Sequence, residues 1–461
     1  MNDLSMRSHK LRGYVSHGAD LRSGKLSPKT YLEETLSKIT QLDKSIGAFV
    51  TVNRDGARQA AEDSAKRWAN GKPLSPIDGM PVAIKDIIET ADMPTGQGSP
   101  MWEGTDWKRD SASVHALREA GAVIIGKTTT TEFASSHPWH KTQNPHDPKR
   151  TPGGSSSGSA AAVGAGMVPA GLGTQVVGSI LRPASFCGAV GFKPSVGAIN
   201  RSGSHDHFSQ SCQGAIGATL ADTWAVLRAI ADRAGGDPGF VGLTGDVDFK
   251  TRTRPGKLAI VETYGWKHTS EGGRKAFAAA KQRLQTVGIE LLSRADDPDI
   301  EAVDQSLSEA MDLTMSINAW EGRWPLNTYS DMDPTKLSQS ARDRLLAAEK
   351  MTQKQFGELL ARREAVRATW AKAAAKYDAL ITLGACGAAP VGLGTTGNTA
   401  MNVSASLLGC PALTIPVLAD EGLPLGLQLL GRANDDAALF GVASWIAAEG
   451  LSRPDLVGTV A

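Results

Sequence analysis

The spacing of apolar residues near the start of the chain predicts a helix. In residues 27–43, Leu32, Leu36 and Ile39 recur on one helical face, while the opposite positions are polar. Ser27 stands where an N-cap is expected, and the proline that follows suits the first helical turn. We expect this amphipathic helix to pack its apolar face on the main body of the protein.

The next segments alternate between strand and helix patterns. Residues 46–53 are strand-like, and the alanine-rich segment from about 58 to 70 predicts a helix that Gly71 ends. The apolar run PVAIK then reads as a buried strand that ends on Lys85, residues 112–120 as a helix, and 122–127 as a second buried strand. This order is typical of a parallel βαβ unit and predicts a twisted sheet with helices on both faces.

Residues 152–194 join a serine- and glycine-rich opening to a long alanine-rich continuation, and no charge interrupts them before Arg182. A flexible linker is one interpretation of the opening GGSSSGS. A linker stays polar, however, whereas AAAVGAG and MVPAGLGT have the composition of close-packed backbone inside a domain. We therefore expect this stretch to be buried.

Composition narrows the possible partners. The chain has 461 residues with 49 Lys plus Arg and 48 Asp plus Glu, so its net charge of +1 gives no reason to expect nucleic acid or an anionic membrane as partner. No window approaches 18 uninterrupted apolar residues, and the N-terminal residues lack the apolar core of a signal peptide. We expect a cytoplasmic protein with a small-molecule substrate, present as a monomer or a homodimer.

Neither the cysteines nor the histidines suggest a metal centre. The cysteines stand singly, without CxxC spacing, which favours buried thiols: Cys187, Cys212, Cys386 and Cys410. The spacings of the histidines match no compact ligand motif: His137, His140, His146, His205 and His207. We therefore expect no metal and no other cofactor.

The stretch 152–194 resembles the signature of the amidase signature family of Ser-Ser-Lys hydrolases. In that family a GGSSxGS loop supplies a bridging serine and a GxxxGSxxxP segment supplies the nucleophile, which by resemblance are Ser155 and Ser179 here. Lys85, in MPVAIKD, would be the third member. Further matches extend the resemblance over nearly the whole chain: residues 126–134, 409–416 and 422–432.

The resemblance implies an α/β fold in which a large twisted mixed β-sheet is covered by helices on both faces. It also implies one amidase signature domain over residues 1–461, although a chain of this length could form two domains. We expect four parts: an N-terminal helical part (about 1–70), a catalytic core (71–220), a variable helical part that covers the substrate (about 221–380), and a C-terminal completion of the sheet (381–461).

The family's chemistry assigns a role to each of the three residues. Neutral Lys85, its pKa lowered by burial, would take a proton through Ser155 from Ser179, which then forms an acyl-enzyme. By analogy with the family, the oxyanion would be held by backbone N–H groups of one turn: Val176, Val177, Gly178 and Ser179. Ser156 is expected to hydrogen-bond Lys85.

The chain departs from the family beside the nucleophile. The usual pattern Asp-x-Gly-Gly-Ser-x-Arg is replaced, with neutral Gln175 at one end, Leu181 at the other and Arg182 displaced by one residue. Both members of an Asp/Arg pair are lost together, so no charge is left unpaired, and Gln175 and Arg182 are expected to support the site. Val177 replaces a glycine, and a β-branched residue resists a positive φ.

Two other functions compete with a simple hydrolase. Catalytic subunits of glutamine-dependent tRNA amidotransferases share this fold and carry an acidic residue that binds glutamine; its place here is Thr399, and the nearby family Asn is Ser406. Both replacements argue against glutamine. A catalytically dead binding module would lack one of the three residues Lys85, Ser155 and Ser179, and all three are present.

Substrate preference rests on indirect signs. Gln175 and Thr399 are neutral, so the chain lacks charges at these positions that would recognise an amino acid. Flat apolar walls for an aryl group could come from three tryptophans, Trp139, Trp320 and Trp324. The alternative is that these tryptophans belong to the core. We expect a small uncharged amide, anilide or aryl carbamate (urethane), because family members of the aryl acylamidase and urethanase types act on such bonds.

Overall fold

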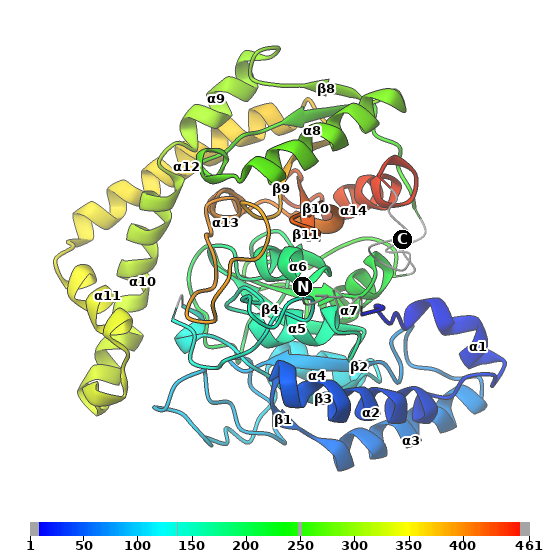
Figure 1. Cartoon of the computed structure of the whole chain (residues 1–461). Helices are drawn as coiled ribbons and strands as arrows, with labels where there is room; N and C mark the ends of the chain where they lie inside the picture. The colour runs from blue at the N-terminus through cyan, green and yellow to red at the C-terminus, as the bar shows by residue number, and fades with distance from the viewer. Residues whose placement is uncertain (1–8, 136, 248–250, 452–461) are drawn as a thin grey trace, which may run out of the picture.

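One sheet runs through the whole protein. The computed structural model describes residues 9–135, 137–247 and 251–451. Its strands form a single sheet in the order β1-β3-β2-β4-β6-β5-β10-β11-β9-β7-β8, which runs from β1 at the bottom of Figure 1 to β8 at the top. The strand bounds are β1 Phe49–Val52, β2 Pro81–Lys85, β3 Val123–Thr128, β4 Ala170–Gln175, β5 Val190–Lys193, β6 Cys212–Gly217, β7 Lys257–Ile260, β8 Glu290–Leu292, β9 Ala379–Leu383, β10 Ala412–Asp420 and β11 Leu423–Leu430.

The sheet is mixed, as expected. Strand β2 pairs in parallel with β3 and β4, and β7 pairs in parallel with β8 and β9, whereas the other neighbours are antiparallel. The predicted βαβ unit is therefore present as β2, helix α4 (Ala112–Glu119) and β3.

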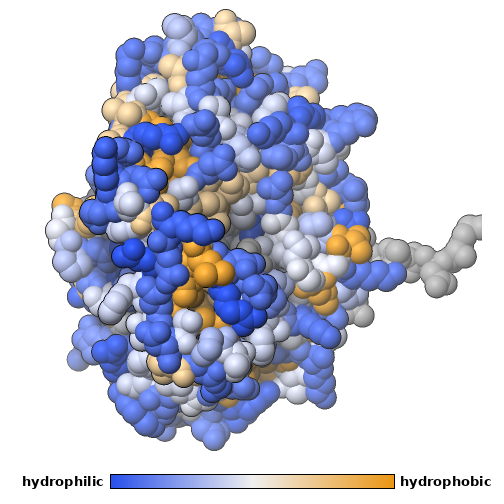
Figure 2. Space-filling view, turned by 90° about the vertical axis from the view of Figure 1, so that its left-hand side faces the viewer, coloured by the Kyte–Doolittle hydropathy of each residue, from blue (hydrophilic) through white to orange (hydrophobic). Residues whose placement is uncertain are grey.

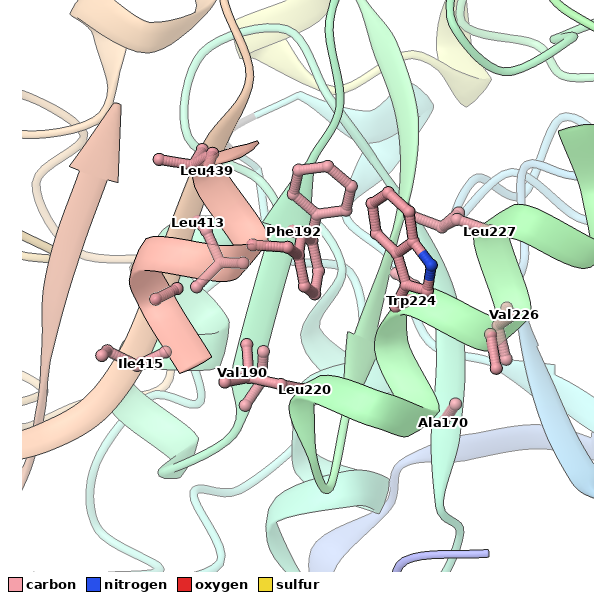
Figure 3. Packing of buried hydrophobic residues seen from close by; sticks show 14 of the residues in the cluster. Ala170, Val190, Phe192, Leu220, Trp224, Val226, Leu227, Leu413, Ile415 and Leu439 are labelled. Carbon is pink, nitrogen blue, oxygen red and sulfur yellow. The ribbon is translucent and has the colours of Figure 1, made fainter. Parts of the chain in front are cut away.

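Alternate residues of the strands enter two different cores. Val82 and Ile84 of β2 belong to one apolar cluster, while Ala83 between them belongs to a second. The first cluster includes side chains of α7 (Leu220–Ala234) and α14 (Asp436–Trp445), as Figure 3 shows around Phe192 and Trp224. The second includes side chains of α2 (Pro28–Ile46), α3 (Arg54–Ala69) and α5 (Ser157–Gly164). Because successive side chains of a strand point to opposite faces, helices cover both faces of the sheet, which confirms the predicted fold class.

The helices that form these layers have the following bounds: α1 Gly18–Arg22, α2 Pro28–Ile46, α3 Arg54–Ala69, α5 Ser157–Gly164, α6 Leu181–Cys187, α7 Leu220–Ala234, α8 Glu271–Thr286, α9 Pro298–Ser306, α10 Ala310–Met332, α11 Gln339–Glu349, α12 Gln353–Ala374, α13 Val403–Leu408 and α14 Asp436–Trp445.

Local signals set the ends of the first helices. The Ser27 side chain accepts a hydrogen bond from the Lys29 N–H at the start of α2, as predicted. Helix α3 begins before residue 58, because Asn53 caps it by accepting from the Gly56 N–H at 3.1 Å. The earlier start is an N-cap effect that the alanine pattern alone did not reveal.

The region from about 221 to 380 is mostly helical, and α10, α11 and α12 form an arm at the left of Figure 1. Its helical stretch 340–377 is broken before α12, where Thr352 and Gln355 form a capping box. The short strands β7 and β8 also come from this region, and the sequence pattern did not indicate them.

Viewed from the side of this arm, the surface is largely hydrophilic, with several apolar patches (Figure 2). Within the described ranges no helix is long and apolar enough to cross a membrane. The four cysteines are free thiols; Cys187, Cys212 and Cys410 are buried, and Cys386 is half-buried. The terminal segments 1–8 and 452–461 of the expected domain lie outside the described residues.

Candidate active site

Lys85 lies at the carboxyl end of β2 and is completely buried. Its Nζ donates to Ser155 Oγ at 2.7 Å and to Thr174 Oγ1 at 2.8 Å, with a longer contact of 3.4 Å to the Thr174 carbonyl. Burial lowers the pKa of Lys85 from 10.5 to about 7, and the charge of Asp206 opposes this shift. A lysine with such a pKa is substantially neutral near pH 7.

The serine-rich loop brings the expected bridging serine to Lys85. Ser155 follows a cis peptide bond from Gly154, and helix α5 begins two residues later. The Ser156 N–H donates to the Ser179 carbonyl at 3.2 Å, which ties this loop to the loop of the expected nucleophile. Lys85 and the two serines are therefore brought to one place.

The expected hydrogen bond between Ser156 and Lys85 is not the one formed. The Ser156 hydroxyl donates instead to the Thr174 carbonyl at 3.4 Å, and it is Thr174 that contacts Lys85 beside Ser155. Thr174 is the penultimate residue of β4, and its role depends on how β4 lies beside β2. Sequence spacing alone carries no signal for that contact.

Exposure increases from the lysine to the expected nucleophile. Lys85 is 0% exposed, Ser155 1% and Ser179 7%. Ser179 lies in the turn between β4 and α6, so its backbone is fixed by a strand on one side and a helix on the other.

Gln175 determines the shape of that turn. Its Oε1 accepts from the N–H groups of Ile180 and Leu181 at 2.9 and 3.0 Å, at the start of α6, and its Nε2 donates to Ser406 Oγ at 3.2 Å. The Ser406 hydroxyl in turn donates to the Val177 carbonyl at 3.1 Å. The neutral glutamine thus satisfies first-turn donors of α6 without a charge.

The turn also accommodates Val177. Among the described residues, those other than glycine with a positive φ do not include Val177, so the β-branched side chain causes no strain of that kind. Within the same described part of the chain, no protein group accepts a hydrogen bond from the N–H of Val177, Gly178 or Ser179. These three donors remain available to a ligand.

Arg182, in the first turn of α6, connects that helix to two loops. Its Nη2 donates to the Gly154 carbonyl at 2.6 Å and to Thr396 Oγ1 at 3.1 Å. Arg182 therefore supports the backbone just before Ser155. The side chain is almost completely buried, and burial lowers its pKa to about 10. Among the described residues its hydrogen-bond partners are neutral, so the expectation that no buried charge is left unpaired is wrong: the displaced arginine enters the core without a carboxylate.

The three tryptophans expected to line a pocket do not form a buried wall. Trp139 is 47% exposed and Trp324 76% exposed, while the ring of Trp320 stacks on Phe356 with centroids 5.4 Å apart. The expectation rested on residue type, which does not reveal the direction of a side chain.

A different aromatic group lies near the serine loop. Phe133 contacts Tyr329 of α10 with ring centroids 5.0 Å apart, and Tyr329 contacts Trp102 at 5.4 Å. Phe133 is near this loop because Thr131, two residues before it, approaches Gly154. A Cβ placed on Gly154 would lie 3.3 Å from Thr131 Cγ2. These rings were missed because residues 102, 133 and 329 are distant in sequence.

Two of the five histidines considered above have individual side-chain partners. His146 Nε2 contacts the Cys187 carbonyl at 2.9 Å, and His205 Nε2 lies 3.1 Å from Glu89. Burial lowers the pKa of His140, and that of His205 to about 4. Across the residues that the structure describes, no group of three His, Cys, Asp or Glu side chains could hold a metal ion.

Comparisons with known proteins show the family and the fold. A protein-family model described as Amidase matches residues 30–440. A glutamyl-tRNA(Gln) amidotransferase subunit from Chloroflexus aurantiacus is 31% identical over 480 residues, which cover 92% of this chain and 93% of that protein. The crystal structure of an amidase superposes with a TM-score of 0.83 at 26% identity, covering 95% of this chain and 99% of the other. A bacterial aryl acylamidase of the amidase signature family, 19% identical, shares the fold with a TM-score of 0.82, covering 96% and 97% of the two chains.

Proposed function

Because the chain belongs to the amidase family, we propose that it is a serine hydrolase that cleaves the C–N bond of a small neutral amide, anilide or carbamate. The observation that carries the proposal is the 2.7 Å contact between Lys85 Nζ and Ser155 Oγ, made by a buried lysine whose pKa is lowered to about 7. A neutral amine at this distance can accept a proton from a serine.

In the proposed acylation step, Ser179 Oγ attacks the substrate carbonyl carbon. The Ser179 proton passes to Ser155 Oγ while the Ser155 proton passes to Lys85 Nζ, so the lysine becomes an ammonium. When the C–N bond breaks, Ser155 gives a proton to the leaving nitrogen and regains one from Lys85. The products of this step are a free amine and an ester on Ser179.

Hydrolysis of the ester completes the cycle. Water attacks the acyl carbonyl, Lys85 again accepts the proton through Ser155, and Ser179 is released with the acid. In both steps the oxyanion is stabilised by backbone donors of the turn formed by Val176, Val177, Gly178 and Ser179. Each such donor typically contributes about 3 kcal/mol to stabilisation of the transition state.

The proposed substrate is uncharged beside the scissile bond. Gln175 is neutral, with its Oε1 hydrogen-bonded in the turn and its Nε2 hydrogen-bonded to Ser406. Among the described residues, the hydrogen-bond partner of the Thr399 hydroxyl is the sulfur of Met311, at 3.9 Å.

The aryl group on the substrate is proposed from the position of Phe133 near the serine loop. There its ring contacts Tyr329 and packs beside the cluster around Leu326 and Leu337. An aryl carbamate fits the same attack, because its carbonyl presents the same geometry.

Intact-mass measurement of the protein mixed with nitroanilides, aryl carbamates, aliphatic amides and glutamine tests this proposal. We expect an acyl adduct that is absent from Ser179→Ala, and a higher kcat/KM for aryl substrates than for glutamine or aliphatic amides. Turnover without any adduct that depends on Ser179 would contradict the acyl-enzyme, and preferential turnover of aliphatic amides would contradict only the aryl group.

A second candidate is the catalytic component of a glutamine-dependent tRNA amidotransferase, which the 31% identity to a protein of that kind favours. In that case the chain would release ammonia from glutamine and work with partner proteins. Thr399 in place of an acidic residue argues against it. Measurement of ammonia released from glutamine, with and without an added aryl amide, separates the two functions.

A further inference from the structure

The loop before β6 passes directly beside the residues that follow Lys85. Ser204 forms an isolated bridge with Ile88, and the His205 N–H donates to the Ile87 carbonyl at 3.0 Å. Since this contact is antiparallel, the next residue of the loop, Asp206, lies alongside the 85–86 end of β2. Ligands of open α/β sheets commonly bind at the carboxyl ends of such strands.

Asp206 is a buried carboxylate without a hydrogen bond. Its side chain is 2% exposed, and in the described part of the chain neither carboxylate oxygen has a hydrogen-bond partner. Its backbone carbonyl accepts from Arg201 Nη1 at 3.5 Å, and the charge of that guanidinium, which is hydrogen-bonded to Asp237, also acts on Asp206 without a hydrogen bond to its carboxylate. The charge of Asp206 acts on Lys85, whose lowered pKa it opposes. A buried charge without hydrogen bonds is costly, so a carboxylate in this state calls for a partner.

Other buried carboxylates of this protein are satisfied by the protein itself. Asp222 accepts from the N–H groups of Tyr14 and Val15, each at 2.9 Å, and Asp436 accepts from the N–H and the hydroxyl of Ser195 at 2.8 and 2.7 Å. These two residues hold segments together. The carboxylate of Asp206 accepts no hydrogen bond from the described residues, which distinguishes it from Asp222 and Asp436.

Gln213 shares this property. It is 1% exposed, and neither atom of its amide has a hydrogen-bond partner among the described residues. Gln213 lies directly opposite Thr174 in the β4–β6 ladder, so the two side chains project from the same face of the sheet. Thr174 Oγ1 is 2.8 Å from Lys85 Nζ, which places the Gln213 amide close to the catalytic lysine.

The segment between Asp206 and Gln213 also carries buried polar atoms without hydrogen-bond partners among the described residues, and α10 holds it in place. Gln210 Oε1 and Ser211 Oγ are buried without partners in the same described region. Gln210 Nε2 donates to Asn318 Oδ1 of α10 at 3.2 Å, and Ser209 is hydrogen-bonded to Glu321 of the same helix. The loop is therefore fixed between the sheet and the arm, and it does not need its free acceptors for its own structure.

We propose that Asp206 and Gln213 form a subsite beside Lys85 that binds a nitrogen group of the substrate carrying two or more N–H donors. A carboxylate is an acceptor only, and the amide oxygen of Gln213 adds a further acceptor. A urea or primary amide matches this set and keeps the substrate neutral, whereas an amidinium or guanidinium group would match the acceptors but contradict the neutral substrate proposed above. The inference rests on the proposed function. It specifies further that the small substrate carries one group with N–H donors.

Calorimetric titration with small probes tests the subsite without any turnover. The probes are methylguanidinium (a cation with N–H donors), methylurea (neutral with N–H donors), tetramethylurea (no N–H donor) and acetate (an anion). We expect the wild-type protein to bind one or both of the first two and neither of the last two. Preference between methylguanidinium and methylurea distinguishes a cationic from a neutral substrate group.

The variants Asp206→Asn and Gln213→Met identify the residues involved. Each should weaken binding of the preferred probe about 10-fold or more, because a hydrogen bond to a charged group or a buried polar partner is lost. The control Asp55→Asn, which removes a fully exposed carboxylate of α3, should bind like the wild type. Equal binding in the wild type and Asp206→Asn, or no binding of either donor probe, would overturn the subsite.

Thermal unfolding separates a binding role from a structural one. Asp206→Asn removes a buried charge and Gln213→Met removes a buried amide, and neither group has a hydrogen-bond partner among the described residues, so both variants should keep the wild-type Tm or exceed it. A Tm that falls in both variants would show that the two side chains hold a structural network, which would contradict the subsite. Labelling of Ser179 by a fluorophosphonate tests the proposed function separately: it should occur in all these variants, and the donor probe should slow it in the wild type and Asp55→Asn but much less in Asp206→Asn and Gln213→Met.

Discussion

Lys85 Nζ and Ser155 Oγ lie 2.7 Å apart although 70 residues separate them in the chain. The contact exists because Lys85 ends β2, while Ser155 lies in the loop before α5, a helix that packs on β2, β3, β4 and β6. Both ends are rigid elements of the core. The pair is therefore positioned by the sheet and its covering helix, and it does not depend on the helical arm.

Substitution of the two serines tests their different roles. Ser179→Ala should abolish turnover, since no other residue would form the acyl-enzyme, and Ser155→Ala should lower kcat by several orders of magnitude because the proton path to the leaving group is cut. Both variants should unfold at the wild-type temperature. Residual activity of Ser179→Ala above about a tenth of the wild type would rule out the assignment, since loss of a nucleophile costs about 10⁶ in kcat in a well-studied serine hydrolase.

The pH dependence of kcat/KM tests the state of Lys85. The base must be neutral, and its pKa is lowered from 10.5 to about 7 by burial. Activity should therefore rise with pH below 7 and level off above it. The nearby charge of Asp206 favours the ammonium, so Asp206→Asn should move the midpoint to lower pH. Activity that continues to rise beyond pH 9 would contradict a neutral Lys85.

Gly178→Ala tests the turn that precedes the nucleophile. An added Cβ would lie 3.0 Å from Asn402 Cβ and 3.1 Å from its Oδ1, so either Asn402 or the turn must move by a few tenths of an ångström, and we expect the donors of the turn to be displaced. Loss of one donor should lower kcat about 100-fold or more with little change in KM. Gly357→Ala is the matched control, because an added Cβ at this position of α12 meets nothing within 4 Å. Equal kcat in the two variants would show that the geometry of this turn does not affect catalysis.

Lys127→Met tests the buried ion pair next to Lys85. Lys127 Nζ lies 3.2 Å from Asp86 Oδ1, and both side chains are buried. Removing the cation leaves an unpaired buried carboxylate, so the free energy of unfolding in urea should fall by about 3–5 kcal/mol. Lys108→Met, which breaks an exposed pair with Asp106, should change it little. Similar losses in the two variants would show that burial of the pair is unimportant.

Local signals made much of the fold predictable. Ser27 and the following proline marked the start of α2, and the run ending on Lys85 marked β2, because caps and apolar runs act within a few residues. Strands β7 and β8 were missed because KLAI and ELL are too short to show a period inside a helical region.

The site was only partly predictable for a similar reason. A motif located Lys85, Ser155 and Ser179, since each occurs in a characteristic local sequence. Thr174 and Gln213 could not be found this way, because their proximity to Lys85 depends on how β2, β4 and β6 are aligned. Trp324 is exposed because it lies on a face of α10 that points to solvent, and this orientation also depends on how the helices pack.

The central claim is that Lys85 and Ser155 activate Ser179 to form an ester with the acyl group of the substrate. The most direct measurement is peptide mapping by mass spectrometry after rapid acid quenching of the enzyme during turnover of an aryl amide or aryl carbamate. We predict a mass increase equal to the acyl group on the peptide that contains Ser179, and no increase in Ser179→Ala. Turnover with an unmodified Ser179 peptide, or an acyl group found on another residue, would contradict the account.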